Sequence, residues 1–190
     1  MKLDRILPFA KKLLEKAITS GGVVVDATLG NGHDTVFLAG LIGPSGRLYG
    51  FDVQEEAIRT STERLKKHGL ADRVTIFHAG HEQLFKLIPD EHHGTVTAAI
   101  FNLGYLPGSD KAIVTKPETT ISAIQQLLEI MAPEGIIILV IYHGHTEGAV
   151  ERDALLTYCQ DIDQKKAHVL QYQFVNQQNN PPFIIAIEKR

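Results

Sequence analysis

The sequence contains one cysteine, no tryptophan and two methionines among its 190 residues. Because Cys159 stands alone, the chain can form neither an intrachain disulfide nor a zinc site built on cysteines. It also has no apolar run of the roughly 20 residues that a membrane helix needs, and charged residues interrupt the segment where a signal peptide would lie. These absences predict a cytoplasmic protein with no membrane partner.

The chain lacks a strong excess of positive charge, since its net charge at pH 7 is -3. This balance argues against the broad basic surface with which proteins grip long nucleic acids, but it leaves room for a local RNA site. The cations expected on the active side are Lys111, Lys116 and Arg152. With 44% apolar and 22% charged residues, the length fits a single domain spanning residues 1–190.

Short apolar, β-rich runs alternate with helical patterns along the whole chain. Strands are expected at residues 23–27, 47–52, 73–78, 97–102, 135–142, 168–175 and 183–189. The turn between the last two is too short for a crossover helix, so these strands must be antiparallel. Repeated strand–helix units predict an α/β fold, with a largely parallel sheet of about seven strands and ligands at the carboxyl ends of the strands.

A glycine-containing loop follows the first expected strand and reads D-A-T-L-G-N-G-H-D-T from Asp26 to Thr35. Gly30 and Gly32 allow a tight turn and a close approach of the backbone to a ligand. The second strand ends at Asp52, 20 residues after Gly32, where an acid can accept hydrogen bonds from both ribose hydroxyls of an adenosine. The spacing therefore predicts a nucleotide-binding turn.

The charges around this loop distinguish between nucleotides. A dinucleotide site requires a third glycine at the position of Thr35, and Asp34 would repel a pyrophosphate. Asp26 and Asp34 suit instead the ammonium group and the sulfonium charge of S-adenosyl-L-methionine. Three alternatives stay open at this point: a nucleotide-binding oxidoreductase, a non-catalytic nucleotide-binding module and a structural turn without a ligand.

Four motifs together resemble the YtqB-like family of methyltransferases, the tRNA-modifying MnmM enzymes, and they lie at residues 26–35, 50–54, 78–82 and 102–108. The resemblance covers nearly the whole chain. It implies a class I (Rossmann-like) methyltransferase fold, a three-layer sandwich with strand order 3-2-1-4-5-7-6. It also implies methyl transfer to the aminomethyl nitrogen of 5-aminomethyl-(2-thio)uridine at the tRNA wobble position, with the anticodon region as partner, and a homodimer. Ribosomal RNA, a small amine or a protein are the alternative substrates within this class.

The resemblance also assigns the cofactor site. It places the methionine part of the cofactor at the glycine loop, the ribose at Asp52 and the adenine beside the residues that follow the second and third strands. The residues expected to bind the cofactor are Asp26, Thr28, Gly30, Asn31, Gly32, Asp34, Asp52, Val53, Gln54, Gly80, His81 and Asn102.

The reacting end is expected after the fourth strand. Many amino-methyltransferases carry N-P-P-Y there, and this chain has Asn102-Leu103-Gly104-Tyr105. An amide oxygen and a backbone carbonyl can accept the hydrogens of a neutral amine and aim its lone pair at the methyl group. Tyr105 can stack on a base. Asn102 and Tyr105 are therefore predicted catalytic residues. His143, which follows the fifth strand and can accept a proton, is the third.

Further substrate contacts are expected from residues that follow the fourth, fifth and sixth strands, namely Leu103, Gly104, Tyr105, Tyr142, His145 and Asn180. His143 and His145 flank a glycine but lack a third ligand at a suggestive spacing, so no metal site is predicted. Residues 180–183 read N-P-P-F, but they follow the sixth strand and are interpreted as the turn into the last one.

Overall fold

A single seven-stranded sheet runs through the protein, in a computed structural model that describes residues 2–104 and 114–190. The strands are β1 (Val23–Asp26), β2 (Arg47–Asp52), β3 (Val74–His78), β4 (Val96–Leu103), β5 (Met131–Ile141), β6 (Ala167–Tyr172) and β7 (Phe183–Lys189). Their order is β3-β2-β1-β4-β5-β7-β6, and β7 runs antiparallel to both of its neighbours. The expected fold class, strand order and reversed last strand are confirmed.

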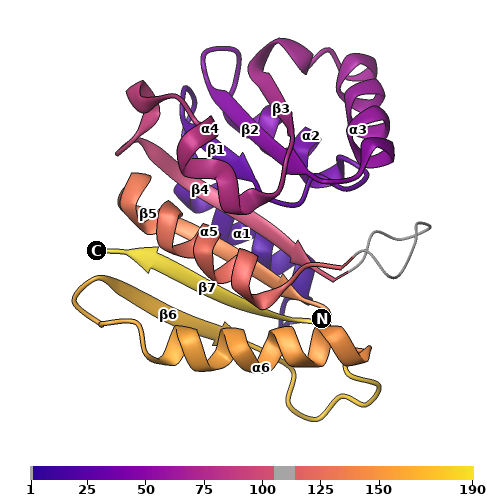
Figure 1. The fold of residues 1–190 in the computed structure, drawn as a ribbon, viewed down its shortest axis with the longest axis vertical. Coiled ribbons are helices and arrows are strands. Elements are labelled where there is room, and N and C mark those ends of the chain that lie inside the picture. Colours follow the sequence, from indigo (N-terminus) through magenta and orange to yellow (C-terminus); the bar gives the residue numbers. More distant parts are fainter. Residues whose placement is uncertain (1, 105–113) are drawn as a thin grey trace.

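Helices cover both faces of the sheet (Figure 1). The α-helices are α1 (Ile6–Ala17), α2 (His33–Leu41), α3 (Glu55–Lys67), α4 (Leu84–Leu87), α5 (Pro117–Ile130) and α6 (Thr146–Gln160). Short 3₁₀ turns, η1 (Ala71–Arg73), η2 (His81–Gln83) and η3 (Asp90–His92), flank β3 and α4. In the part of the chain that the structure describes, no helix is long and apolar enough to cross a membrane.

Two apolar layers fill the space between the sheet and the helices. Side chains of α4, α5 and α6 pack on one face, and side chains of α1, α2 and α3 pack on the other. The strand β5 contributes Ile137, Leu139 and Ile141 to the first layer and Ile136, Ile138 and Val140 to the second. Because both of its faces are covered, β5 is apolar without alternation, as is typical of a central strand.

The parallel register brings the carboxyl ends of five strands, β1 to β5, to one edge of the sheet. Asp26 lies beside Gly50 of β2 and Ile100 of β4, Asp52 lies beside His78 of β3, and Asn102 lies beside Val140 of β5. The loops that leave these strands therefore converge, although they are far apart in the sequence. This edge is where ligands bind in open α/β sheets.

Some element boundaries differ from the expected ones. The strand β5 begins at Met131 rather than at residue 135, because its first residues pair with Val96 before the register shifts. The strand β6 ends at Tyr172 rather than at residue 175, and the chain then turns away toward Asn180. The segment between β3 and β4, for which the sequence indicates a short helix near residues 82–88, forms a 3₁₀ turn followed by the four residues of α4.

Candidate active site and cofactor cleft

A cavity of about 1000 Å³ opens at the carboxyl edge of the parallel strands. Its wall is formed by the loops after β1 to β5 and by the β6–β7 loop. Predicted site residues that line it are Thr28, Gly30, Asn31, Gly32, Asp34, Asp52, Val53, Gln54, Gly80, His81, Asn102, Leu103, Gly104, Tyr142, His143, His145 and Asn180. Asp26 lies outside the lining, and Tyr105 and Lys111 lie outside the described residues.

The glycine loop is held in its turn by α3. Gly30 and Gly32 have φ angles of 50° and 74°, in the left-handed region that favours glycine. The Ser61 hydroxyl donates to the Gly30 carbonyl over 2.9 Å, and Arg64 Nε donates to the Asn31 carbonyl over 2.7 Å. These contacts fix the backbone at the cavity wall before any ligand arrives.

Asp26 supports this loop from behind. Its side chain is completely buried, accepts the Thr35 hydroxyl over 2.6 Å and accepts the Thr28 N–H over 3.3 Å. Burial raises the pKa of this carboxyl from 3.8 to about 7, against the lowering effect of the Thr35 hydrogen bond. The expectation that Asp26 meets the methionine part of the cofactor stays a prediction. In this geometry the carboxyl acts on the cavity through the backbone that it holds.

Asp52 lies in the cavity wall, and its carboxylate oxygens can accept more hydrogen bonds than they do here. One carboxylate oxygen accepts the Gly30 N–H over 2.9 Å, and the other accepts the Gln54 N–H over 2.9 Å. Each carboxylate oxygen can accept a second hydrogen bond. The pair therefore presents two fixed acceptors to the cavity, which fits the two neighbouring hydroxyls of a ribose.

Asn102 and Asp34 form a polar pair at the centre of the lining. Asn102 Nδ2 donates to Asp34 Oδ2 over 2.8 Å, and the Asn102 N–H donates to the Thr28 hydroxyl over 2.7 Å. Because a carboxylate only accepts, the contact identifies the amide nitrogen of Asn102, and among the described residues no hydrogen bond engages its Oδ1. The two predicted residues are thus joined, which the sequence did not indicate.

His81 is a buried residue of the cavity lining. Its Nδ1 lies 2.9 Å from the Ala27 carbonyl, which can only accept, so Nδ1 carries the hydrogen. Burial lowers the pKa of this imidazole and favours its neutral form. Its Nε2 is buried and has no hydrogen-bond partner among the described residues. The expectation that His81 closes over the adenine stays a prediction.

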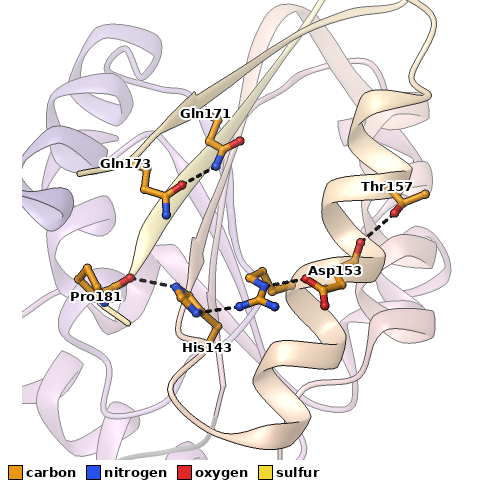
Figure 2. Close-up of polar contacts among 7 residues, drawn as sticks. His143, Asp153, Thr157, Gln171, Gln173 and Pro181 are labelled. Atoms are coloured by element: carbon orange, nitrogen blue, oxygen red, sulfur yellow. Dashed lines mark hydrogen bonds and ion pairs between the residues drawn. The ribbon is translucent and has the colours of Figure 1, made fainter. Parts of the chain in front are cut away.

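His143 joins two elements at the rim of the cavity (Figure 2). Its Nε2 donates to the Pro181 carbonyl over 3.0 Å, and its Nδ1 accepts from Arg152 Nη1 over 3.3 Å. Arg152 Nε in turn donates to Asp153 over 2.7 Å. Both ring nitrogens are therefore engaged, which favours a structural role for His143 in holding the β6–β7 loop against α6.

His145 sits at the start of α6, between two glycines. A Cβ at Gly148 would lie 2.6 Å from His145 Cε1, and one at Gly104 would lie 3.8 Å from the same atom. The absence of a side chain at Gly148 gives the ring its place in the cavity wall. Among the two predicted histidines, His145 is thus the better candidate for contact with a substrate.

Sequence reasoning missed residues that precede and begin α5. Val114, Thr115 and Thr119 line the cavity, as does Lys116, which was expected only as an RNA contact. Glu151 of α6 is buried behind them and accepts hydrogen bonds from Thr115 and Thr120. No sequence signal pointed to Glu151, since a glutamate within a helix usually faces solvent.

Three comparisons with known proteins agree with this geometry. The family model described as "Putative rRNA methylase" matches residues 48–188. A crystal structure of a "putative rRNA-methylase" from Clostridium thermocellum is 42% identical, covers 100% of both chains and superposes with a TM-score of 0.96. A "putative methyltransferase" from Streptococcus mutans, solved in complex with SAH, is 36% identical over 99% of both chains, with a TM-score of 0.89.

Among curated proteins, the chloroplastic tRNA (mnm(5)s(2)U34)-methyltransferase of Arabidopsis thaliana is 30% identical over 183 residues. The match covers 92% of this chain and 66% of the plant protein, so the chain spans slightly less than two thirds of that relative. The ribosomal RNA small subunit methyltransferase H of Bifidobacterium adolescentis is 39% identical over 44% of this chain and 24% of its own length.

The fold and the site together define a class I S-adenosyl-L-methionine-dependent methyltransferase. Within that class, the chain belongs to the family described as rRNA methylases, since the family model matches most of its length. The predicted family and cofactor class are confirmed, and the oxidoreductase alternative is set aside.

Proposed function

We propose that the chain transfers a methyl group from S-adenosyl-L-methionine to RNA, at the aminomethyl nitrogen of 5-aminomethyl-(2-thio)uridine in the wobble position of tRNA. The observation that carries this proposal is the oriented amide of Asn102 at the end of β4. Its nitrogen is bonded to Asp34, so its oxygen is the end left to accept a hydrogen from an amine in the cavity.

The chemistry requires a neutral amine with a correctly aimed lone pair. When bound, the cofactor supplies a methyl carbon activated by its sulfonium. An alkyl ammonium must first lose a proton, because only the free lone pair can attack the methyl carbon while the carbon–sulfur bond breaks toward sulfur. Asn102 Oδ1 then accepts one amine hydrogen and restricts the direction of the lone pair. The new ammonium loses its second proton after transfer.

Carboxylates in the cavity wall suit the cofactor, and one of them also contacts the residue that orients the substrate amine. Asp34 lies in the wall beside Asn102 and suits the ammonium of the methionine part of the cofactor, whereas Asp52 suits the ribose. The same Asp34 carboxylate therefore touches the group that orients the substrate amine. This arrangement couples occupation of the cofactor site to the geometry at the reacting nitrogen.

The relatives favour tRNA over ribosomal RNA as the substrate. The plant relative named as a wobble-uridine tRNA methyltransferase aligns with 92% of this chain, whereas the ribosomal RNA methyltransferase H aligns with 44%. Ribosomal RNA stays the second candidate, because both the family description and these shorter matches refer to it.

Nucleoside mass analysis of tRNA tests the substrate. In cells that lack this protein, we expect 5-aminomethyl-2-thiouridine to accumulate and its methylated product to disappear, and the purified protein should restore the product in vitro. Normal wobble methylation in such cells, with a methyl group missing from ribosomal RNA, would contradict tRNA as the substrate and favour ribosomal RNA.

Asn102→Ala tests the assignment of the reacting centre. Because the amide acts on the incoming amine, we expect kcat to fall on the order of 100-fold, with a much smaller change in cofactor affinity. Asn180→Ala is the comparison variant, since Asn180 lines the cavity from the β6–β7 loop and its substitution should change mainly KM. Steady-state kinetics and calorimetry separate the two. Full turnover in Asn102→Ala with normal cofactor binding would move attention to His145.

A further inference from the structure

The end of β4 is fixed by three hydrogen bonds from three different segments. The Asn102 N–H donates to the Thr28 hydroxyl over 2.7 Å, and the Leu103 carbonyl accepts the Tyr142 N–H over 3.1 Å. The Gly104 N–H donates to the Thr115 hydroxyl oxygen over 3.0 Å. Each of these contacts restrains the backbone that carries Asn102.

Gly104 and Thr115 pair in both directions. In addition to the contact with its hydroxyl, the Thr115 N–H donates to the Gly104 carbonyl over 3.2 Å. Both residues line the cavity. Gly104 has a φ angle of 146°, in a region that side chains disfavour, so its conformation depends on such restraints rather than on its own preference.

A buried carboxylate lies behind this pair. Glu151 of α6 is 2% exposed and accepts the Thr115 hydroxyl with one oxygen and the Thr120 hydroxyl with the other, the latter over 2.8 Å. Buried carboxylates are costly unless their oxygens accept hydrogen bonds, and these two hydroxyls meet that requirement. In the described part of the chain, no Lys or Arg forms an ion pair with Glu151.

The direction of the hydrogen bonds connects Glu151 to β4. The Gly104 N–H can only donate, so the Thr115 oxygen must accept it. A hydroxyl has one hydrogen, and here that hydrogen points to Glu151. Glu151 therefore sets the rotation of the Thr115 hydroxyl and keeps a lone pair of its oxygen aimed at Gly104.

We infer that Glu151 is a positioning residue for methyl transfer, which acts through Thr115 on Gly104 and so on the placement of Asn102. The inference rests on the proposed function for the identity of the substrate. Thr120 provides an internal comparison, because its hydroxyl meets the same carboxylate but, among the described residues, makes no hydrogen bond with the end of β4.

The test compares two isosteric substitutions, Thr115→Val and Thr120→Val. Each removes one hydroxyl from Glu151, and Thr115→Val in addition removes the acceptor of the Gly104 N–H. With tRNA that carries 5-aminomethyl-2-thiouridine, we expect Thr115→Val to lower kcat about 10- to 100-fold while cofactor affinity is kept. Thr120→Val should keep kcat, and Thr115→Ser should restore it. Thr115→Ala, which removes the same hydroxyl with less steric demand, decides the question if Thr115→Val does not fold.

Amide hydrogen exchange at Gly104, measured by NMR in the presence of SAH, provides a readout that needs no RNA. Exchange should accelerate in Glu151→Ala, which keeps the Thr115 hydroxyl as a possible acceptor of the Gly104 N–H, and not in Thr120→Val. If the wild-type protein methylates no wobble uridine, the proposed function fails, and this exchange experiment alone decides the inference. Equal effects of the two valine variants on kcat, or unchanged Gly104 exchange in Glu151→Ala, would overturn the role of Glu151 and leave it a structural residue.

Discussion

Three aspartates serve the cofactor cleft in different ways, although the sequence presents them as one acidic set. Asp34 and Asp52 lie in the cavity wall, whereas Asp26 is completely buried behind the glycine loop. Asp26 uses both of its oxygens on Thr28 and Thr35. Its influence on the cavity is therefore transmitted by the loop backbone and by its charge state, since burial raises its pKa to about 7.

Asp26→Asn should remove a pH dependence of stability. Between its unfolded pKa of 3.8 and its folded pKa of about 7, the folded state retains the Asp26 proton that the unfolded state has lost. The free energy of unfolding of the wild type therefore falls as pH rises through this window. Asparagine cannot ionise, and the Thr35 hydroxyl can donate to it or accept from it.

The stability of Asp26→Asn relative to the wild type should accordingly rise with pH between about 4 and 7, by up to roughly 4 kcal/mol, and should level off on either side. Urea denaturation of both proteins at a series of pH values measures this difference. Two parallel stability curves would show that the carboxyl ionises normally in the folded protein.

The glycine loop and α3 act as one unit at the scale of secondary structure. Ser61 and Arg64 of α3 bond the loop carbonyls, and Gly32 opens α2 in a left-handed conformation directly against Ser61. A Cβ at Gly32 would lie 2.7 Å from Ser61 Oγ and 3.0 Å from Ser61 Cα. The helix can therefore accommodate a side chain there only by moving away from the loop.

Gly32→Ala should weaken cofactor binding, and Gly69→Ala is its matched control. Both glycines have left-handed φ angles, 74° and 67°, so both substitutions carry a conformational cost of about 1–2 kcal/mol. A Cβ at Gly69 meets nothing within 4 Å, so that cost should be its whole effect. Thermal unfolding and calorimetry with the cofactor compare them. Normal affinity in Gly32→Ala would show that the loop tolerates displacement of α3.

In the complete molecule, the sheet has two edge strands, β3 and β6. Among the described residues, β6 pairs with β7 alone, and its side chains Val169 and Leu170 are 40% and 49% exposed. Open apolar edges of this kind favour pairing with another chain. A domain of 21.0 kDa also offers little surface for a tRNA.

We therefore expect a homodimer in solution. Light scattering at micromolar concentration should give twice the chain mass of 21.0 kDa. Leu170→Lys, which places a charge on the open edge, should shift the mass toward the monomer if β6 forms the interface. A monomer mass for the wild type would contradict the expectation and require tRNA to bind a single chain.

The features of this protein that could be predicted from its sequence are local ones. Apolar runs and turn residues predicted each strand, and the run from Asp26 to Thr35 with Asp52 indicated the cofactor, because those signals depend on near neighbours or on a fixed spacing. The strand order came from the family resemblance, since periodicity says nothing about which strands lie side by side. The start of β5 and the end of β6 were predicted at the wrong residues, because pairing and register, rather than propensity, delimit a strand.

The connections between the site residues are a property of the three-dimensional packing. It separated His143, with both nitrogens engaged, from His145 in the cavity wall, and it placed Asp26 behind the loop rather than in it. It also joined Thr115 to Glu151, which are 36 residues apart in the chain. A hydrogen bond depends on the approach and direction of two groups, and for groups on different elements these are set by packing across the sheet rather than by local sequence.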